Sequence, residues 1–198
     1  MTTSTKAPES RARADEASDD ALIEAARGGD VRAFEALVLR HEAGVLRLLR
    51  LLGVPGTDRE DVAQEVFLRV FRHLAGFRRG RPFASWMYRV VVNSAHDYRL
   101  RTRRVAFVEA PWSEDTERAA DSALGPEGDA ARRDLRRSLE AALTLLTERE
   151  RAVFVLREME GLATREVART LGVTAITVRR HLSLAKDRLR RALSRLPP

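Results

Sequence analysis

The sequence predicts an all-α protein with two small helical domains joined by a flexible acidic linker, the second domain containing a helix-turn-helix. Three observations indicate this fold class. Apolar residues recur at spacings of three and four along most of the chain, which is the period of an amphipathic helix. Glycine and proline interrupt these runs at only a few points. Between residues 105 and 129 the apolar periodicity is lost and acidic residues accumulate, and a helical pattern resumes from Ala130.

The composition favours an anionic partner. The chain of 198 residues has a formal net charge of +7, and its only lysines are Lys6 and Lys186. Arginine binds phosphate groups and guanine edges with two parallel hydrogen bonds, so nucleic acid is the favoured partner. The absence of cysteine excludes disulfides, thiolate catalysis and cysteine-based metal sites. We expect neither a metal nor a cofactor, and no apolar run is long enough to span a bilayer.

The N-terminal part divides into a tail and a first helical domain. Residues 1–17 are small, polar and charged without periodicity, so we expect them to be disordered. The first domain then covers residues 18–104. It opens with a short helix that Asp19 or Asp20 caps and that ends at Gly28.

A second, longer helix follows from a cap at Asp30 and stops at Gly53. Thr57 and Glu60 then form a predicted capping box for the third helix. The apolar line of this third helix is expected to consist of Val62, Val66, Val70 and Leu74, widened by Phe67 and Phe71.

The third helix also carries a compact polar patch. Asp61, Gln64 and Glu65 lie at spacings that place them on one exposed face. In a basic chain, such an acidic and amide patch beside aromatic residues suits the docking of an arginine-rich partner helix. An ordinary solvated acidic face is the alternative that these residues leave open.

The fourth helix begins after Pro82 and ends in a polar and basic segment. Basic residues beside polar and aromatic ones are what a single-stranded nucleic-acid site needs. The residues of this predicted site are Asn93, Ser94, His96, Asp97, Arg99 and Arg101, with Arg103 and Arg104 beyond them. Trp86 either contributes to this site or packs in the core. Ser94, His96 and Asp97 form no catalytic triad, because neighbouring helix residues point in different directions.

The acidic linker is assigned to residues 105–132 and the second domain to residues 133–198. Within the second domain, Thr147 and Glu150 form another predicted capping box. The helix that they start is expected to end at Gly161.

The helix-turn-helix follows this segment. Thr164 is expected to cap its first helix, Gly172 to form the turn, and Thr174 to cap the second helix. The buried stripe of the second helix is predicted to be Val178, Leu182, Ala185, Leu189 and Leu193. The DNA-facing set is predicted to be Thr174, Thr177, Arg179, Arg180, Ser183 and Lys186. A helical hairpin with a solvated basic face is the alternative.

The chain resembles a bacterial RNA polymerase sigma factor of the small extracytoplasmic-function (ECF) group. The first signature is DREDVAQEVFLRVFRHLAGF followed by FASWMYRVVVNSAHDYRLR. The second is LLTERERAVFVLREMEGLATREVARTLGVTAITVRRHLSLAKDRLR. Their order and separation make the resemblance specific, and it covers almost everything from Asp19 to Leu196.

The resemblance implies three surfaces. The first domain would dock on the clamp helices of the polymerase's largest subunit through Asp61, Gln64 and Glu65. The segment around Asn93 would capture flipped bases of the melted minus-ten element, with the following arginines on phosphate. The helix from Thr174 would recognise the minus-thirty-five element as duplex DNA, and the polymerase flap would be a further contact.

The resemblance also implies an anti-sigma factor as a partner. The expected location is the cytoplasm, at the nucleoid or held at the membrane by that anti-sigma factor, with no membrane insertion. Two residues depart from the family pattern: Leu184 stands where a basic residue is common, and Ser183 where a bulkier one is common. A minus-thirty-five sequence therefore cannot be transferred from relatives.

Two other function classes stay open on the residues alone. A free-standing helix-turn-helix regulator would bind a duplex operator without polymerase, as a dimer. A nucleic-acid-processing enzyme would need a metal or a nucleophile, and His41–Glu42 lacks the second histidine of a zinc motif. We therefore expect the chain not to be an enzyme.

Overall fold

The computed structural model describes residues 18–78, 80, 82–109 and 130–194. The side chains of residues 105–109, 130–136 and 193 are not described. Throughout the described part the chain forms helices and no strand, so the all-α prediction is confirmed. The predicted tail and residues 110–129 of the predicted linker lie outside this part.

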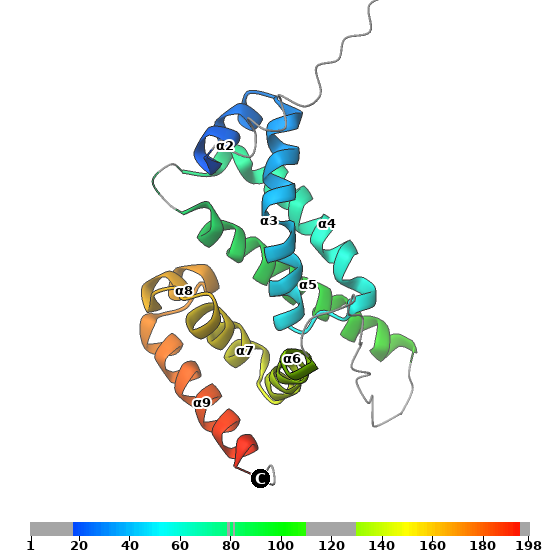
Figure 1. The fold of residues 1–198 in the computed structure, drawn as a ribbon, viewed down its shortest axis with the longest axis vertical. Coiled ribbons are helices and arrows are strands. Elements are labelled where there is room, and N and C mark those ends of the chain that lie inside the picture. Colours follow the sequence, from blue (N-terminus) through cyan, green and yellow to red (C-terminus); the bar gives the residue numbers. More distant parts are fainter. Residues whose placement is uncertain (1–17, 79, 81, 110–129, 195–198) are drawn as a thin grey trace, which may run out of the picture.

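The helices form two bundles that lie one above the other in Figure 1. The N-terminal bundle consists of α2 (Asp19–Arg27), α3 (Val31–Leu51), α4 (Gly56–His73), the 3-10 turn η1 (Leu74–Gly76) and α5 (Phe83–Glu109). The C-terminal bundle consists of α6 (Ala130–Thr144), α7 (Glu148–Phe154), the π-helical turn η2 (Val155–Met159), α8 (Thr164–Leu171) and α9 (Ala175–Leu193). α6 begins at Ala130, where the sequence predicted that helix resumes, whereas α5 extends through Glu109 into the range assigned to the linker.

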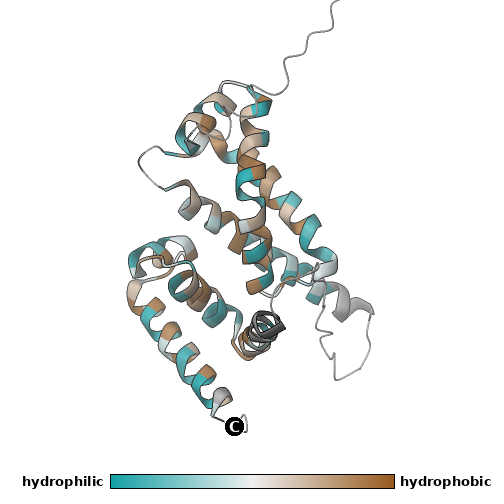
Figure 2. Cartoon of the chain, in the orientation of Figure 1, coloured by the Kyte–Doolittle hydropathy of each residue, from teal (hydrophilic) through white to brown (hydrophobic). Residues whose placement is uncertain are grey.

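The core of the N-terminal bundle lies where α3, α4 and α5 meet. Leu49, Val66 and Val91 are fully buried there, one from each helix. Figure 2 shows apolar and polar residues mixed along each of these helices, as the amphipathic pattern requires. Trp86 packs edge-on against Phe77, with ring centroids 5.5 Å apart. Of the two interpretations of Trp86, packing in the core is the one that the structure supports.

The core of the C-terminal bundle confirms the predicted stripe of the helix-turn-helix. Val178 and Ala185 of α9 are fully buried, and so is Val167 of α8. Leu189 is buried and Leu182 packs at the edge of this core. The side chain of Leu193 is outside the described part.

Four of the predicted local signals are confirmed. The Asp30 carboxylate accepts hydrogen bonds from two backbone N–H groups in the first turn of α3. Thr147 and Glu150 form the capping box of α7. The Thr174 hydroxyl caps α9, and Gly172 adopts the left-handed conformation, with φ +65°. These signals depend on neighbours within a few residues, which is why the sequence reveals them.

The predicted cap of the first helix is wrong. Ser18 caps α2, and neither Asp19 nor Asp20 does. Asp19 does not cap α2, because its side chain contacts the next helix. Its carboxylate binds the guanidinium of Arg40 at 2.9 Å and the ring of His41 at 3.0 Å, both on α3.

Two other predicted caps are also displaced. Pro55 is the N-cap of α4, so the helix begins before Thr57 and has no side-chain cap. Proline holds its φ near the helical value, which lets a helix start directly after it. Ala163 is the N-cap of α8, which makes Thr164 the first helical residue, and Glu166 accepts a hydrogen bond from the Ala163 N–H at 2.8 Å.

Two buried contacts join the bundles. The Arg151 guanidinium of α7 reaches the Leu52 carbonyl at 3.5 Å and donates to the Leu143 carbonyl at 2.8 Å. Gly53 makes room for it, because a Cβ there would lie 2.0 Å from Arg151 Nη1. This close approach requires glycine.

The second contact centres on Glu160, whose side chain is 3% exposed. Its carboxylate pairs with Arg47 of α3 at 2.8 Å and accepts a hydrogen bond from the Tyr88 hydroxyl of α5 at 2.9 Å. Burial and the negative charge of Glu160 raise the pKa of Tyr88 to about 12. The tyrosine pKa therefore reports on contact between the bundles.

Replacing Gly172 by alanine is expected to destabilise the protein by about 1–2 kcal/mol. No atom would crowd the new methyl group, so the cost comes from the left-handed backbone alone. Gly44→Ala is the matched control. Gly44 lies within α3 without a positive φ and with free space around it, so alanine should stabilise by about 0.5–1 kcal/mol. Urea denaturation of both variants measures the difference, and equal stabilities would show that Gly172 is not constrained.

Tyr88 should titrate about two pH units above an ordinary tyrosine, whose pKa is about 10. The Tyr98→Phe variant leaves Tyr88 as the only tyrosine, because the chain has 2. Tyrosinate absorbance should then rise with a midpoint near 12, and adding Glu160→Gln should lower that midpoint.

Because the folded pKa of Tyr88 is raised, its contribution to stability is complete below about pH 10 and is lost between about pH 10 and 12. Urea denaturation across this window should therefore show a fall in stability, smaller in the Glu160→Gln variant. A Tyr88 midpoint near 10 in the otherwise native protein would mean that α5 and the C-terminal bundle do not meet in solution.

Candidate DNA- and partner-binding surfaces

The start of α9 is rigidly defined. Thr174 accepts a hydrogen bond from the Thr177 N–H at 3.1 Å, and the two hydroxyls are 2.8 Å apart. Both threonines of the predicted DNA-facing set therefore serve the cap. Their hydroxyls are already hydrogen-bonded to each other and to backbone, which orients the first turn of the helix.

The outward face of α9 is basic. Arg179, Arg180 and Ser183 are exposed. Arg180 and Ser183 lie on the side opposite to the buried stripe, and Arg179 lies at its flank. Within the described part of the chain, neither Arg179 nor Arg180 forms an ion pair or hydrogen bond through its side chain. Lys186 differs, because its ammonium group binds Glu158 at 3.1 Å. Two arginines of the set are thus available to a ligand without breaking an internal contact.

The polar end of α5 is divided between exposed and buried residues. Asn93 and His96 are exposed, whereas Ser94 is fully buried. In this arrangement the Ser94 hydroxyl cannot touch DNA, so the prediction that Ser94 lies on a surface is wrong. Within the described part of the chain the buried Ser94 hydroxyl has no hydrogen-bond partner, so its burial carries a desolvation cost.

Asp97, Arg101 and Glu65 belong to one network of charges. Arg69 of α4 binds both the Asp97 carboxylate, at 2.6 Å, and the Glu65 carboxylate. Arg101 binds Glu65 at 2.7 Å. The hydrogen bond from Arg101 is the largest cause of the lowered pKa of Glu65. The Glu65 side chain is therefore half-buried and held in ion pairs, unlike Asp61 and Gln64, the other two residues of the predicted patch on α4.

Asp61 and Gln64 are exposed on α4, as predicted. Leu68 and Phe71 continue the same side of the helix and are 49% and 53% exposed. The Phe71 ring packs on Phe34 of α3, with centroids 4.9 Å apart. Phe71 widens the apolar line of α4, as predicted, but it does so at the surface. The patch of Asp61 and Gln64 thus lies beside an exposed aromatic residue, in agreement with the sequence analysis.

The carboxylate of Glu148 contacts several side chains at the polar end of α5. Glu148, the first residue of α7, binds the His96 ring at 3.3 Å, Arg99 at 3.4 Å and Arg103 at 2.8 Å. We call these four residues the Glu148 junction. Arg99 is only 12% exposed and also donates to the Leu52 carbonyl. Two residues of the predicted single-strand site, His96 and Arg99, and the neighbouring Arg103 thus already contact a carboxylate of the same chain, which the sequence did not predict.

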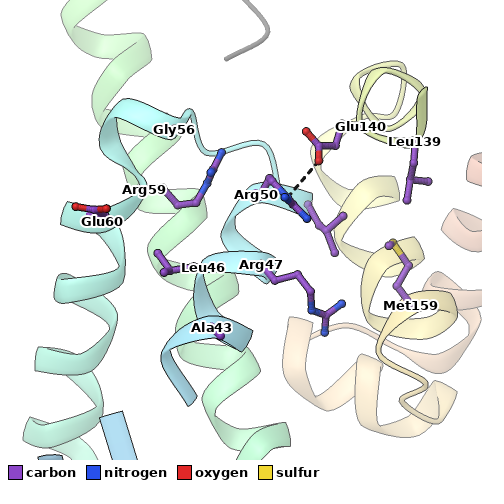
Figure 3. Close-up of a pocket in the computed structure, with 11 residues that line it drawn as sticks. Ala43, Leu46, Arg47, Arg50, Gly56, Arg59, Glu60, Leu139, Glu140 and Met159 are labelled. Carbon is purple, nitrogen blue, oxygen red and sulfur yellow. Dashed lines mark ion pairs between the residues drawn. The ribbon is translucent and has the colours of Figure 1, made fainter. Parts of the chain in front are cut away.

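A cavity of about 700 Å³ lies between the bundles (Figure 3). Its walls come from α3 and the start of α4 on one side and from α6 and η2 on the other. Arg50 crosses toward α6 and binds Glu140 at 3.1 Å, while Leu46 and Met159 supply apolar wall. The cavity exists only while the two bundles are in contact.

In the ranges that the structure describes, no three histidine, aspartate or glutamate side chains are placed to hold a metal ion. None of the helices there combines the length and apolar character needed to cross a bilayer.

Both bundles match families of known proteins. The Sigma-70 region 2 family matches residues 37–105, and the Sigma-70 region 4 family matches residues 136–189. The chain is 31% identical to the RNA polymerase sigma-H factor of Pseudomonas aeruginosa, covering 90% of this chain and 95% of that protein. It is 32% identical to the ECF RNA polymerase sigma-E factor of Escherichia coli K12, covering 86% of this chain and 91% of that protein.

Solved structures agree in fold. The chain is similar to CnrH in its complex with the cytosolic domain of CnrY, with 29% identity, a TM-score of 0.64, and coverage of 89% of this chain and 97% of that one. It is also similar in fold to RpoE of Bartonella quintana, solved with the anti-sigma factor NepR, with 20% identity, a TM-score of 0.65, and coverage of 84% and 100%.

These matches decide among the classes left open by the sequence. Both regions of a sigma factor are present in order, which a free-standing regulator would not require, and sigma factors are initiation factors and not enzymes. The chain therefore belongs to the ECF group of RNA polymerase sigma factors and acts as an alternative sigma factor that directs promoter-specific transcription.

Proposed function

We propose that this sigma factor divides promoter recognition between its two bundles, with residues 18–104 and 133–198 as the two working domains. The observation that carries the proposal is the outward face of α9. Arg179 and Arg180 project from a helix-turn-helix and are not engaged by any described side chain. Such a face fits the major groove of duplex DNA, and we assign it to the minus-thirty-five element.

The roles within α9 follow from the contacts of each residue. Arg179 and Arg180 suit guanine edges or phosphate, and Ser183 suits either a base edge or a backbone oxygen. Lys186 would exchange Glu158 for a phosphate. Thr174 and Thr177 act mainly through the cap, because their hydrogen bonds fix how the helix enters the groove.

The polar end of α5 is assigned to the melted minus-ten strand. Asn93 and His96 are exposed to meet a flipped base, and Arg101 is exposed beside them. His96 and Arg99 bind Glu148, so a DNA phosphate can replace that carboxylate only when α7 moves away. We propose that the free protein is closed at this surface. Core polymerase would separate the two bundles, which explains why a sigma factor needs core enzyme for tight promoter binding.

The exposed side of α4 is assigned to the clamp helices of the polymerase's largest subunit. Asp61 and Gln64 supply polar contacts, and Leu68 and Phe71 supply the apolar area that a stable interface needs. Glu65 contributes by holding Arg69 and Arg101 in place. The second domain would then lie near the flap.

An anti-sigma factor is proposed as the controlling partner. CnrH, which is similar to this chain over 89% of its length, is solved with the cytosolic domain of CnrY, and RpoE of Bartonella quintana is solved with the anti-sigma factor NepR. The cavity between the bundles would lie within the surface that such a partner covers. Location at the nucleoid, or at the membrane through that partner, follows from the same proposal.

Combined replacement of Asp61 and Gln64 by alanine should weaken binding to core polymerase by at least about tenfold, because polar anchors at an interface centre each contribute about 1–2 kcal/mol. Both residues are exposed, so the helical circular dichroism should be unchanged. Binding is measured by titrating labelled protein with purified core enzyme.

Asp20→Ala is the matched control for this experiment. Asp20 is an exposed carboxylate in the first turn of α2, away from the exposed side of α4. Its replacement should leave polymerase affinity within about twofold of the native value. Equal affinities for all three proteins would remove α4 from the polymerase interface.

A further inference from the structure

An apolar side chain stands at the centre of the basic face of α9. Ile176 is 72% exposed, more than any other large apolar residue in the described part of the chain. It is the second residue of α9, directly after the Thr174 cap and Ala175. The sequence-based set of DNA-facing residues did not include it.

Helix geometry places Ile176 among the polar residues of this face. With about 100° of rotation per residue, Ile176, Arg180 and Ser183 lie within about 60° of one another. Val178 and Ala185, which are fully buried, lie on the opposite side of the helix. The cap contacts of Thr174 and Thr177 fix the first turn, so the position of Ile176 is fixed as well.

The surroundings indicate which partner Ile176 meets. Arg179 and Arg180 flank it with two positive charges that no described side chain neutralises, so the partner is a polyanion that also offers an apolar group. In the major groove of DNA the only such group on a base edge is the C5-methyl of thymine. The first turn of a recognition helix is the part that comes closest to the bases.

We infer that Ile176 packs on a thymine methyl group in the minus-thirty-five duplex and is a specificity-determining residue. This inference rests on the proposed role of α9. It adds one apolar contact to the arginine contacts, and it assigns to this chain a preference for thymine at one base pair.

The test uses holoenzyme reconstituted from core polymerase and the full chain, on a promoter that it transcribes. Each thymine of the minus-thirty-five element is replaced in turn by deoxyuridine, which removes the methyl group and leaves base pairing intact. For the native protein, initiation should fall about fourfold at one thymine, the effect of losing one buried methyl contact. The Ile176→Ala holoenzyme should be equally active on the thymine and deoxyuridine promoters.

Two further variants sharpen the result. Ile176→Val keeps a branched apolar side chain and should keep most of the sensitivity to deoxyuridine. Leu184→Ala is the matched control, because Leu184 is a 40% exposed apolar residue of the same helix. It lies about 12 Å further along the axis and cannot reach the same methyl group. Its holoenzyme should keep the full fourfold response at the thymine that Ile176 contacts.

The outcomes separate the inference from the function on which it rests. If no single deoxyuridine affects the native holoenzyme, or if Ile176→Ala keeps the full response, the inference is overturned. The Arg179→Ala and Arg180→Ala holoenzymes test α9 itself. If both arginine variants keep native activity on every promoter, α9 does not recognise the minus-thirty-five element. The proposed function of this helix is then contradicted, and the Ile176 inference with it. Loss of activity in both, without any methyl effect, would overturn the Ile176 inference alone.

Discussion

The structure depends on the contact of one carboxylate with a histidine and two arginines of α5. Glu148 lies at the N-terminus of α7, and His96, Arg99 and Arg103 reach it from α5. The positive end of the α7 helix dipole adds to the stabilisation of this carboxylate. Because α7 is held against α5, His96, Arg99 and Arg103 at the polar end of α5 are paired with Glu148, although His96 and Arg103 stay exposed to solvent. The buried Glu160 and Arg151 contacts support the same arrangement.

The polymerase-binding and single-strand surfaces are linked by charge. Arg69 on α4 holds Glu65 of its own helix and Asp97 of α5, and Arg101 returns from α5 to Glu65. In the proposed complex, a polymerase contact on α4 would therefore act on residues that are one ion pair away from the proposed minus-ten surface. Under the same proposal, these basic residues exchange a carboxylate of this chain in the closed form for a phosphate in the open form. Chemical similarity between these two anions makes the exchange possible.

The sequence predicted the structural features that depend on residues close together in the chain. It did not predict those that depend on how the helices pack. Helical periodicity and the caps at Asp30, Thr147 and Thr174 were predictable because each involves residues within one turn. The burial of Ser94 was not predictable, because it depends on how α3, α4 and α5 meet. Nothing in the sequence indicated the contact between Glu148 and His96, which are 52 residues apart. The family resemblance predicted the binding surfaces, but the ion pairs of their residues with the chain's own carboxylates became visible only in the structure.

The most direct test of this account is the affinity of the free protein for single-stranded DNA, measured by fluorescence anisotropy with the minus-ten strand of a promoter that the holoenzyme transcribes. Glu148→Gln should tighten binding by about tenfold, since it weakens three partly exposed ion pairs that each contribute up to about 1 kcal/mol. Glu158→Gln removes a carboxylate that pairs only with Lys186 within the same bundle, and it should bind like the native protein. If Glu148→Gln binds no more tightly than the native protein and Glu158→Gln, the carboxylate does not cover the minus-ten surface, and the closed form is not the state of the free protein.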